Sequence, residues 1–151
     1  GDSLKEMKKN FEMNETSSLL LGKVKKTDIS KYGIAKIREN SKSPELGFIE
    51  EIIEKPSIKK APSDLYAVGR YIFTNDFFKY LSKVKPDKSN EIQLTDAIDF
   101  FIKDNKKVYA FPLDGKIFDC GENIQLILAN LEFAMKDPLM RSHIKNYLKK
   151  K

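Results

Sequence analysis

Apolar runs and mixed apolar and polar stretches predict a set of strands along this chain. The run Leu19-Leu20-Leu21 is short and wholly apolar, which is typical of a strand buried on both faces of a sheet. The segment from Tyr32 to Arg38 alternates apolar and polar side chains, as a half-exposed strand does. A polar stretch with Pro44 follows it, so this strand and the next are expected to form a hairpin. The expected strands cover residues 17–24, 32–38, 48–55, 65–73 and 107–113.

The spacing of apolar residues between these strands predicts helices. Leu4, Met7 and Phe11 recur at helical spacing, so residues 3–13 are expected to form an amphipathic helix. Thr27 is expected to cap a single helical turn, and Thr74 a helix that runs to residue 84. Further helices are expected over 94–103, over the stretch that ends near Asp137-Pro138, and from there to Leu148.

The order of these elements decides the fold class. Asp114-Gly115 is a strong turn signal and predicts a hairpin into a short strand, Lys116 to Asp119. Strands and helices alternate irregularly, which favours an α/β sheet with helices packed on it over a helix bundle or a β-sandwich. With 151 residues and no repeat or low-complexity linker, the chain is expected to fit a single domain, residues 1–151. Within it, residues 4–121 are expected to form the sheet and site, and 122–151 the C-terminal helices.

The number of cysteines and the hydropathy of the chain bear on disulfides, metal sites and the cellular compartment. Cys120 is the single cysteine, which excludes an intramolecular disulfide, and with one histidine, His143, it leaves no Cys/His set for zinc. We expect Cys120 to be a buried thiol and the protein to be cytoplasmic. No apolar run approaches the roughly 20 residues of a membrane helix, so no membrane partner is expected.

The net charge of +6 raises the possibility of a nucleic-acid partner. The lysines, however, are scattered along the chain and interleaved with 22 acidic residues, so no nucleic-acid partner is expected. Nucleic-acid binding is kept only as a third possibility, which rests on charge alone.

Glu54-Lys55-Pro56 places opposite charges where a predicted strand stops. On the two-residue period of a strand, Glu54 and Lys55 are expected to point to opposite faces and not to pair with each other. A lysine at the C-terminal end of a strand lies near the edge where α/β sheets bind ligands, and its ammonium suits phosphate. A solvated strand end is the alternative.

Two glycines and one aspartate are further candidates. Gly33 and Gly69 lie inside strand-like patterns, where glycine marks close approach by a ligand or another backbone, or a bulge. Asp119 lies at a strand-to-helix junction, where its carboxylate could hold a divalent cation or cap the helix.

These residues lie in strings that resemble one family. The strings are YGI at Tyr32, EKP at Glu54, APSDLYAVGRYIF from Ala61, EIQLTDAI from Glu91 and FDCGENIQLILANLEFAMKDP from Phe118. In order and spacing they resemble bacterial UTP-glucose-1-phosphate uridylyltransferases, from about Leu4 to the C-terminus. EIQLTDA and the stretch after Phe118 are far more specific than a lone glycine motif.

The resemblance implies a Rossmann-like nucleotidyltransferase fold with a mixed, mostly parallel sheet and flanking helices. It implies that glucose 1-phosphate attacks UTP to give UDP-glucose and pyrophosphate. In this reading Gly33 presents its backbone to the sugar, Glu54 accepts hydrogen bonds from glucose hydroxyls, and Gly69 lies against the sugar. Lys55 is the catalytic contact to the sugar phosphate, and Asp119 helps to hold Mg²⁺. A homo-oligomer, dimer or tetramer, is also implied.

The family's glycine-rich UTP loop, of the form GxGTRxxPxTK, and its upstream paired aspartates have no counterpart before Leu4. We therefore expect the chain to be the sugar-phosphate-binding, C-terminal half of a protein roughly twice as long, with the N-terminal part of the fold missing and inactive alone. The alternatives are a non-catalytic sugar-phosphate-binding or regulatory module, or a related sugar nucleotidyltransferase that uses another nucleoside triphosphate.

Overall fold

The chain folds into two compact units, Gly1–Asp114 and Gly115–Lys151. The structure is a computed structural model that describes residues 2–38, 47–87 and 90–150. Within these residues, no helix is long and apolar enough to cross a membrane. The predicted polar stretch around Pro44 lies outside the described residues.

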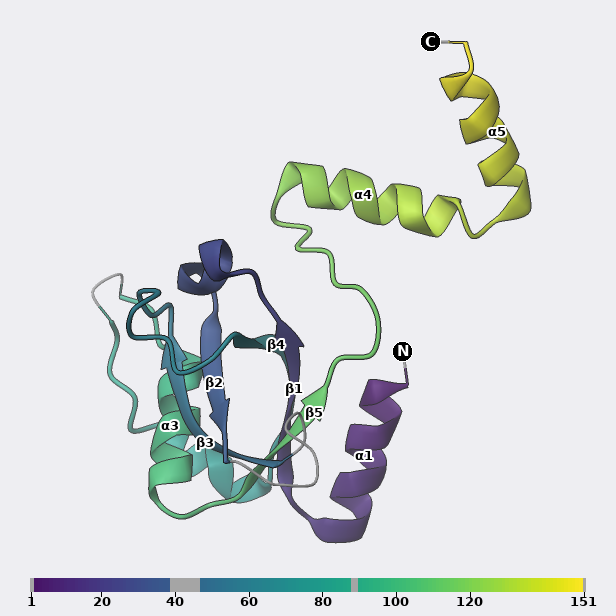
Figure 1. Cartoon of the computed structure of the whole chain (residues 1–151). Coiled ribbons are helices and arrows are strands. Elements are labelled where there is room, and N and C mark those ends of the chain that lie inside the picture. Colours follow the sequence, from purple (N-terminus) through teal and green to yellow (C-terminus); the bar gives the residue numbers. More distant parts are fainter. Residues whose placement is uncertain (1, 39–46, 88–89, 151) are drawn as a thin grey trace. The chain divides into compact units, whose positions relative to one another are not determined.

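The first unit is built on a closed β-barrel, in which the strands follow the order β1-β4-β2-β3-β5 (Figure 1). Their bounds are β1 Ser17–Lys23, β2 Gly33–Ile37, β3 Gly47–Glu54, β4 Leu65–Ile72 and β5 Val108–Pro112. The predicted hairpin is confirmed, because β2 and β3 pair antiparallel.

The sheet is mixed, but the expectation of a mostly parallel sheet is wrong for the described strands. Only β1 and β5 pair in parallel, whereas β1–β4, β2–β3, β2–β4 and β3–β5 are antiparallel. Neighbouring strands run in parallel only where a long crossover returns the chain, and here β2, β3, β4 and α3 all lie between β1 and β5.

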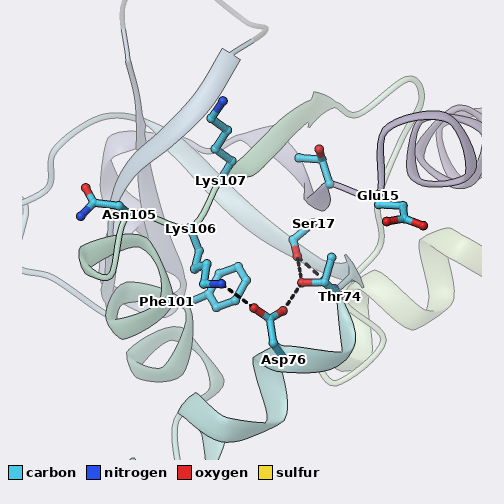
Figure 2. A pocket seen from close by; sticks show the side chains of 9 residues that line it. Glu15, Ser17, Thr74, Asp76, Phe101, Asn105, Lys106 and Lys107 are labelled. Atoms are coloured by element: carbon cyan, nitrogen blue, oxygen red, sulfur yellow. Dashed lines mark hydrogen bonds and ion pairs between the residues drawn. The ribbon is translucent and has the colours of Figure 1, made fainter.

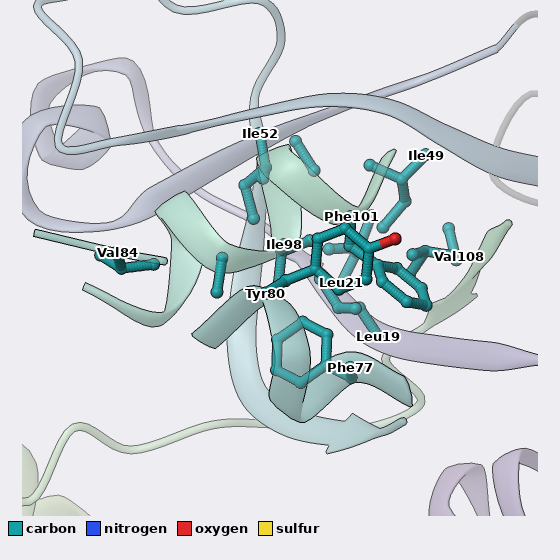
Figure 3. Packing of buried hydrophobic residues seen from close by; sticks show 13 residues of the cluster. Leu19, Leu21, Ile49, Ile52, Phe77, Tyr80, Val84, Ile98, Phe101 and Val108 are labelled. Atoms are coloured by element: carbon teal, nitrogen blue, oxygen red, sulfur yellow. The ribbon is translucent and has the colours of Figure 1, made fainter. Parts of the chain in front are cut away.

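Helices cover two faces of this sheet. On one face α3, Leu94–Lys103, packs against β3, and its Ile98 and Phe101 join Leu19, Leu21 and Ile52 in the larger core cluster (Figure 3). On the other, α1, Ser3–Asn14, brings Met7 against Leu20 and Phe111. Successive leucines of β1 thus enter different clusters, which confirms a strand buried on both faces.

Helix caps were predicted less well than the helices. Thr27 lies inside the 3-10 helix η1, Lys26–Lys31, and caps nothing. Thr74 precedes a 3-10 helix η2, Asn75–Phe77, and a short α2, Phe78–Leu81; its hydroxyl makes no cap, because it donates to the Asp76 side chain instead.

The second unit contains the two predicted C-terminal helices, α4 Asn123–Ala134 and α5 Pro138–Leu148. Asp137 caps α5 by accepting a hydrogen bond from the Met140 backbone N–H at 2.8 Å. The predicted hairpin after Asp114-Gly115 is wrong, since residues 116–119 form no strand. The predicted burial of Cys120 is also wrong, because its side chain is exposed.

Candidate functional site

The end of the barrel where β1 and β5 finish brings two predicted site residues together. Gly33 opens β2 and pairs across the ladder with Glu54, which closes β3. The next residue of β2, Ile34, pairs with Tyr66, and Tyr66 pairs with Gly22 near the end of β1. Gly33 and Glu54 therefore lie side by side at the carboxyl end of the parallel pair, which is the edge where α/β sheets bind ligands.

Glu54 and Lys55 do pair, contrary to the expectation from strand alternation. Lys55 Nζ lies 3.9 Å from Glu54 Oε1, and the side chains are 55% and 22% exposed, respectively. Lys55 has φ of 43°, a left-handed conformation that takes it out of the two-residue alternation. Its backbone N–H donates to the Tyr32 carbonyl at 3.0 Å, which holds this turn in place.

The second carboxylate oxygen of Glu54 has a partner that the sequence reading missed. Thr95 Oγ1 donates to Glu54 Oε2 at 2.9 Å, across 41 positions of the chain. Thr95 is buried in the first turn of α3. It lies within the EIQLTDA string, but only the packing of α3 on β3 reveals its contact with Glu54.

Gly33 is a glycine because two side chains occupy the space beside it. A Cβ at this position would lie 2.7 Å from Thr95 Cγ2 and 3.0 Å from Glu54 Oε2. The irregularity in the β2–β3 ladder falls between Lys36 and Ile37, so a bulge does not explain Gly33. The close approach comes from side chains of this chain rather than from another backbone.

Gly69 is explained by a bulge. Its φ is +74°, and a Cβ there would meet nothing within 4 Å. The β1–β4 register shifts between Leu19, which pairs with Tyr71, and Leu21, which pairs with Ala67, so Gly69 lies in the extra length of β4. It is exposed, and the ladder places it opposite β1 rather than on the β2–β3 pair that carries Glu54.

Asp119 belongs to the second unit, so its position relative to Glu54 is not described. Its Oδ1 accepts a hydrogen bond from the Gly121 backbone N–H at 3.1 Å, and it does not cap α4, whose cap residue is Glu122. Across the described residues, no group of three or more His, Cys, Asp or Glu side chains is placed to hold a metal ion. The role of Asp119 as a magnesium ligand stays a prediction.

Tyr71 is a further neighbour of Glu54. Burial raises the pKa of the Tyr71 phenol, and the negative charge of Glu54 raises it further. The half-buried Tyr71 phenol is therefore neutral at neutral pH and adds no negative charge near Glu54.

A second polar cluster lies at the opposite end of the barrel, where β1 begins (Figure 2). Thr74 Oγ1 donates to Asp76 Oδ1 at 2.6 Å, and Lys106 Nζ lies 2.8 Å from Asp76 Oδ2. Ser17 Oγ accepts a hydrogen bond from the Thr74 backbone N–H at 3.0 Å. These side chains line a pocket of about 340 Å³, to which Gly33, Glu54, Lys55 and Gly69 contribute nothing.

The chain is similar to named proteins over most of its length. It is 34% identical over 144 residues to a UTP-glucose-1-phosphate uridylyltransferase of Streptococcus pneumoniae. The match covers 95% of this chain and 48% of that protein. It is 36% identical over 136 residues to the protein of that name from Haemophilus ducreyi. This second match covers 89% of this chain and 46% of that protein. The chain spans about half the length of the curated relatives it matches, and the family resemblance of its motifs is confirmed.

Solved structures of similar proteins support the same family resemblance. A structure of UDP-glucose pyrophosphorylase complexed with UDP-glucose matches with a TM-score of 0.80 at 35% identity, over 89% of this chain and 50% of that one. A UTP-bound UGPase from Acinetobacter baumannii matches with a TM-score of 0.79 at 27% identity, over 97% of this chain and 49% of that one. The family model described as nucleotidyl transferase matches residues 1–136. With this match and its α/β fold, the chain belongs to the nucleotidyl transferase family.

Proposed function

We propose that the protein containing this chain is a UTP-glucose-1-phosphate uridylyltransferase, and that these residues bind its sugar phosphate. The observation that carries the proposal is the juxtaposition at the end of β3, where the Glu54 carboxylate and the Lys55 ammonium lie 3.9 Å apart beside Gly33. A carboxylate accepts hydrogen bonds from sugar hydroxyls, and an ammonium binds phosphate as a compact point charge. The names of the relatives supply the substrates.

In the proposed reaction a phosphate oxygen of glucose 1-phosphate attacks the α-phosphorus of UTP. One P–O bond forms, the bond to the β-phosphate breaks, and UDP-glucose and pyrophosphate are the products. Such transfer depends on positioning and charge stabilisation rather than on a nucleophilic side chain. Glu54 fixes the sugar through its hydroxyls, and Lys55 holds the attacking phosphate and offsets its charge.

Gly69 and Asp119 have weaker support in this role. Gly69 offers exposed backbone at a bulge, which suits a contact with the sugar. The space beside Gly69 is open, so no neighbouring group of the chain requires a glycine there. Magnesium, which the family resemblance implies, would neutralise phosphate charge when bound. The described residues supply no ligand cluster for it, so Asp119 stays a predicted single ligand. The homo-oligomeric state and the cytoplasmic location likewise stay predictions.

The test is turnover by the full-length gene product in which these residues occur. We expect UDP-glucose and pyrophosphate from UTP and glucose 1-phosphate, measured by chromatography of the nucleotide sugars. Binding of glucose 1-phosphate without turnover would favour the non-catalytic module instead. A preference for another nucleoside triphosphate would favour a related sugar nucleotidyltransferase instead.

A further inference from the structure

We propose that Thr95 is a positioning residue that orients the Glu54 carboxylate toward the sugar, and that Gly33 is a glycine to leave room for this contact. The inference rests on the proposed function, because it assigns Glu54 to the sugar. It adds two roles, one for a residue of α3 and one for the absence of a side chain on β2.

The hydroxyl of Thr95 is committed to Glu54. Thr95 is 6% exposed, and its Oγ1 donates to Glu54 Oε2 at 2.9 Å. A threonine in a helix often returns this bond to a carbonyl of its own preceding turn. Thr95 stands in the first turn of α3, and its hydroxyl instead bonds across to the end of β3. The start of a helix also favours a carboxylate electrostatically, which supports the same arrangement.

The methyl group of Thr95 fixes the direction of that hydroxyl. Its Cγ2 sits only 2.7 Å from where a Cβ of residue 33 would be, so the methyl packs directly on the Gly33 backbone. A β-branched side chain has few χ1 states in a helix. With the methyl held against Gly33, the remaining branch, Oγ1, is aimed at Glu54.

This contact leaves one carboxylate oxygen for a ligand. Oε2 accepts from Thr95, whereas Oε1 lies 3.9 Å from Lys55 Nζ, which is longer than a hydrogen bond. With respect to the described part of the chain, Oε1 therefore keeps its acceptor capacity, and it lies beside the lysine that would hold the phosphate. A hydroxyl and a phosphate of one sugar phosphate can then be recognised at the same edge.

The experiment compares Thr95→Val, which keeps the shape and loses the hydroxyl, with Thr95→Ser, which keeps the hydroxyl and loses the methyl. Steady-state kinetics of the full-length protein are measured with glucose 1-phosphate and UTP varied separately. We expect Thr95→Val to raise the KM for glucose 1-phosphate about 10- to 100-fold, as for the loss of a hydrogen bond to a charged group. The KM for UTP should stay unchanged, and Thr95→Ser should restore most of the loss.

Thr74→Val is the matched control, because it removes the comparable bond from a threonine to Asp76 at the other end of the barrel. It should lower the melting temperature without changing the KM for glucose 1-phosphate. A double-mutant cycle with Glu54→Gln tests whether Thr95 acts through Glu54, in which case the two losses are far from additive. If Thr95→Val does not fold, Thr95→Cys, whose thiol is a weak donor, replaces it in the same cycle.

The outcomes separate the two proposals. A wild-type protein that forms no UDP-glucose overturns the proposed function, and with it the inference. An active wild type in which Thr95→Val and Thr95→Ser behave alike, or in which the losses from Thr95 and Glu54 add, overturns only the positioning role.

Discussion

Two groups of threonine, carboxylate and lysine lie at opposite ends of the same barrel, and they differ in how the carboxylate is used. At the end where β1 begins, Thr74 and Lys106 contact the two oxygens of Asp76 at 2.6 and 2.8 Å. At the end where β1 finishes, Thr95 contacts one oxygen of Glu54 at 2.9 Å, while Lys55 stays 3.9 Å from the other.

The difference separates a structural network from the proposed binding site. The hydrogen bond from Lys106 lowers the pKa of Asp76, and that from Thr74 lowers it further, so this carboxylate is ionised and both of its oxygens are engaged. Among the residues that the structure describes, Glu54 Oε1 has no contact shorter than the 3.9 Å to Lys55, whose side chain is 55% exposed. Residue types alone do not distinguish the two groups, whereas the geometry does.

The largest effect is expected from filling the space beside Glu54. Gly33→Ala places a Cβ against Thr95 Cγ2 and Glu54 Oε2, and overpacking of this kind costs about 1–3 kcal/mol in the free energy of unfolding. Because it also displaces the carboxylate, we expect kcat/KM for glucose 1-phosphate to fall by more than about 100-fold, measured in the full-length protein.

Gly47→Ala is the control for that substitution. A Cβ at Gly47 would lie 2.9 Å from Ile37 Cγ2 and 3.2 Å from the Arg38 carbonyl, so the steric cost is similar but lies away from Glu54. Comparable losses of kcat/KM in Gly33→Ala and Gly47→Ala would mean that Gly33 matters only for stability.

The two lysines provide the next comparison. Lys55→Ala should lower kcat/KM for glucose 1-phosphate about 10- to 100-fold, because a charge-assisted contact to phosphate is lost. Lys106→Ala should leave kcat/KM unchanged and lower the melting temperature, because Lys106 forms an ion pair with Asp76 at the other end of the barrel. Unchanged turnover in Lys55→Ala would remove Lys55 from the site.

A smaller effect is expected from Asp76→Asn, and it depends on pH. Since folding lowers the pKa of Asp76, its contribution to the free energy of unfolding is present above the ordinary Asp pKa of about 3.9. That contribution disappears as the pH falls below this value through the lowered pKa. Thermal melts should therefore show Asp76→Asn less stable than wild type at neutral pH, by about 2–4 °C, with the two converging in acid.

Asp28→Asn is the matched control for this pH series. It removes a surface ion pair with Lys31 at 3.1 Å, and such pairs contribute little to stability. Melting curves of Asp76→Asn that stay parallel to those of wild type down to the lowest pH would contradict the role given to Asp76.

The elements of the fold were largely predictable because they follow local patterns. Met7 marks the buried face of α1, and Leu19 to Leu21 mark a strand covered on both sides, so periodicity alone located these elements. Strand direction was not predictable in this way, because it depends on which strands meet. Asp114-Gly115 has the composition of a tight turn, but no partner strand follows it, so the hairpin does not form.

The candidate site was predictable only in part. Glu54 and Gly33 were identified from their strings, and the ladder does place them together. The pairing of Lys55 with Glu54 was missed, because it depends on the left-handed backbone at Lys55, which no alternating pattern indicates. Thr95 was missed because it is separated from Glu54 by 41 positions and meets it only through the packing of α3 on β3.

The smallest effect, and the most local, concerns Tyr71. Burial is the larger cause of its raised pKa, and the charge of Glu54 is the smaller one, so Glu54→Gln should lower this pKa without returning it to the ordinary value of about 10. Tyr71 can be followed by NMR of carbon-13-labelled tyrosine, with Tyr71→Phe to assign the signal. The protonated phenol stabilises the fold below its ordinary pKa, and this stability is lost as the pH rises through the raised pKa. In Glu54→Gln that loss should be complete at lower pH. Asp76→Asn, at the other end of the barrel, should leave the pKa of Tyr71 unchanged; equal shifts in both variants would mean that Tyr71 senses net charge rather than the Glu54 carboxylate.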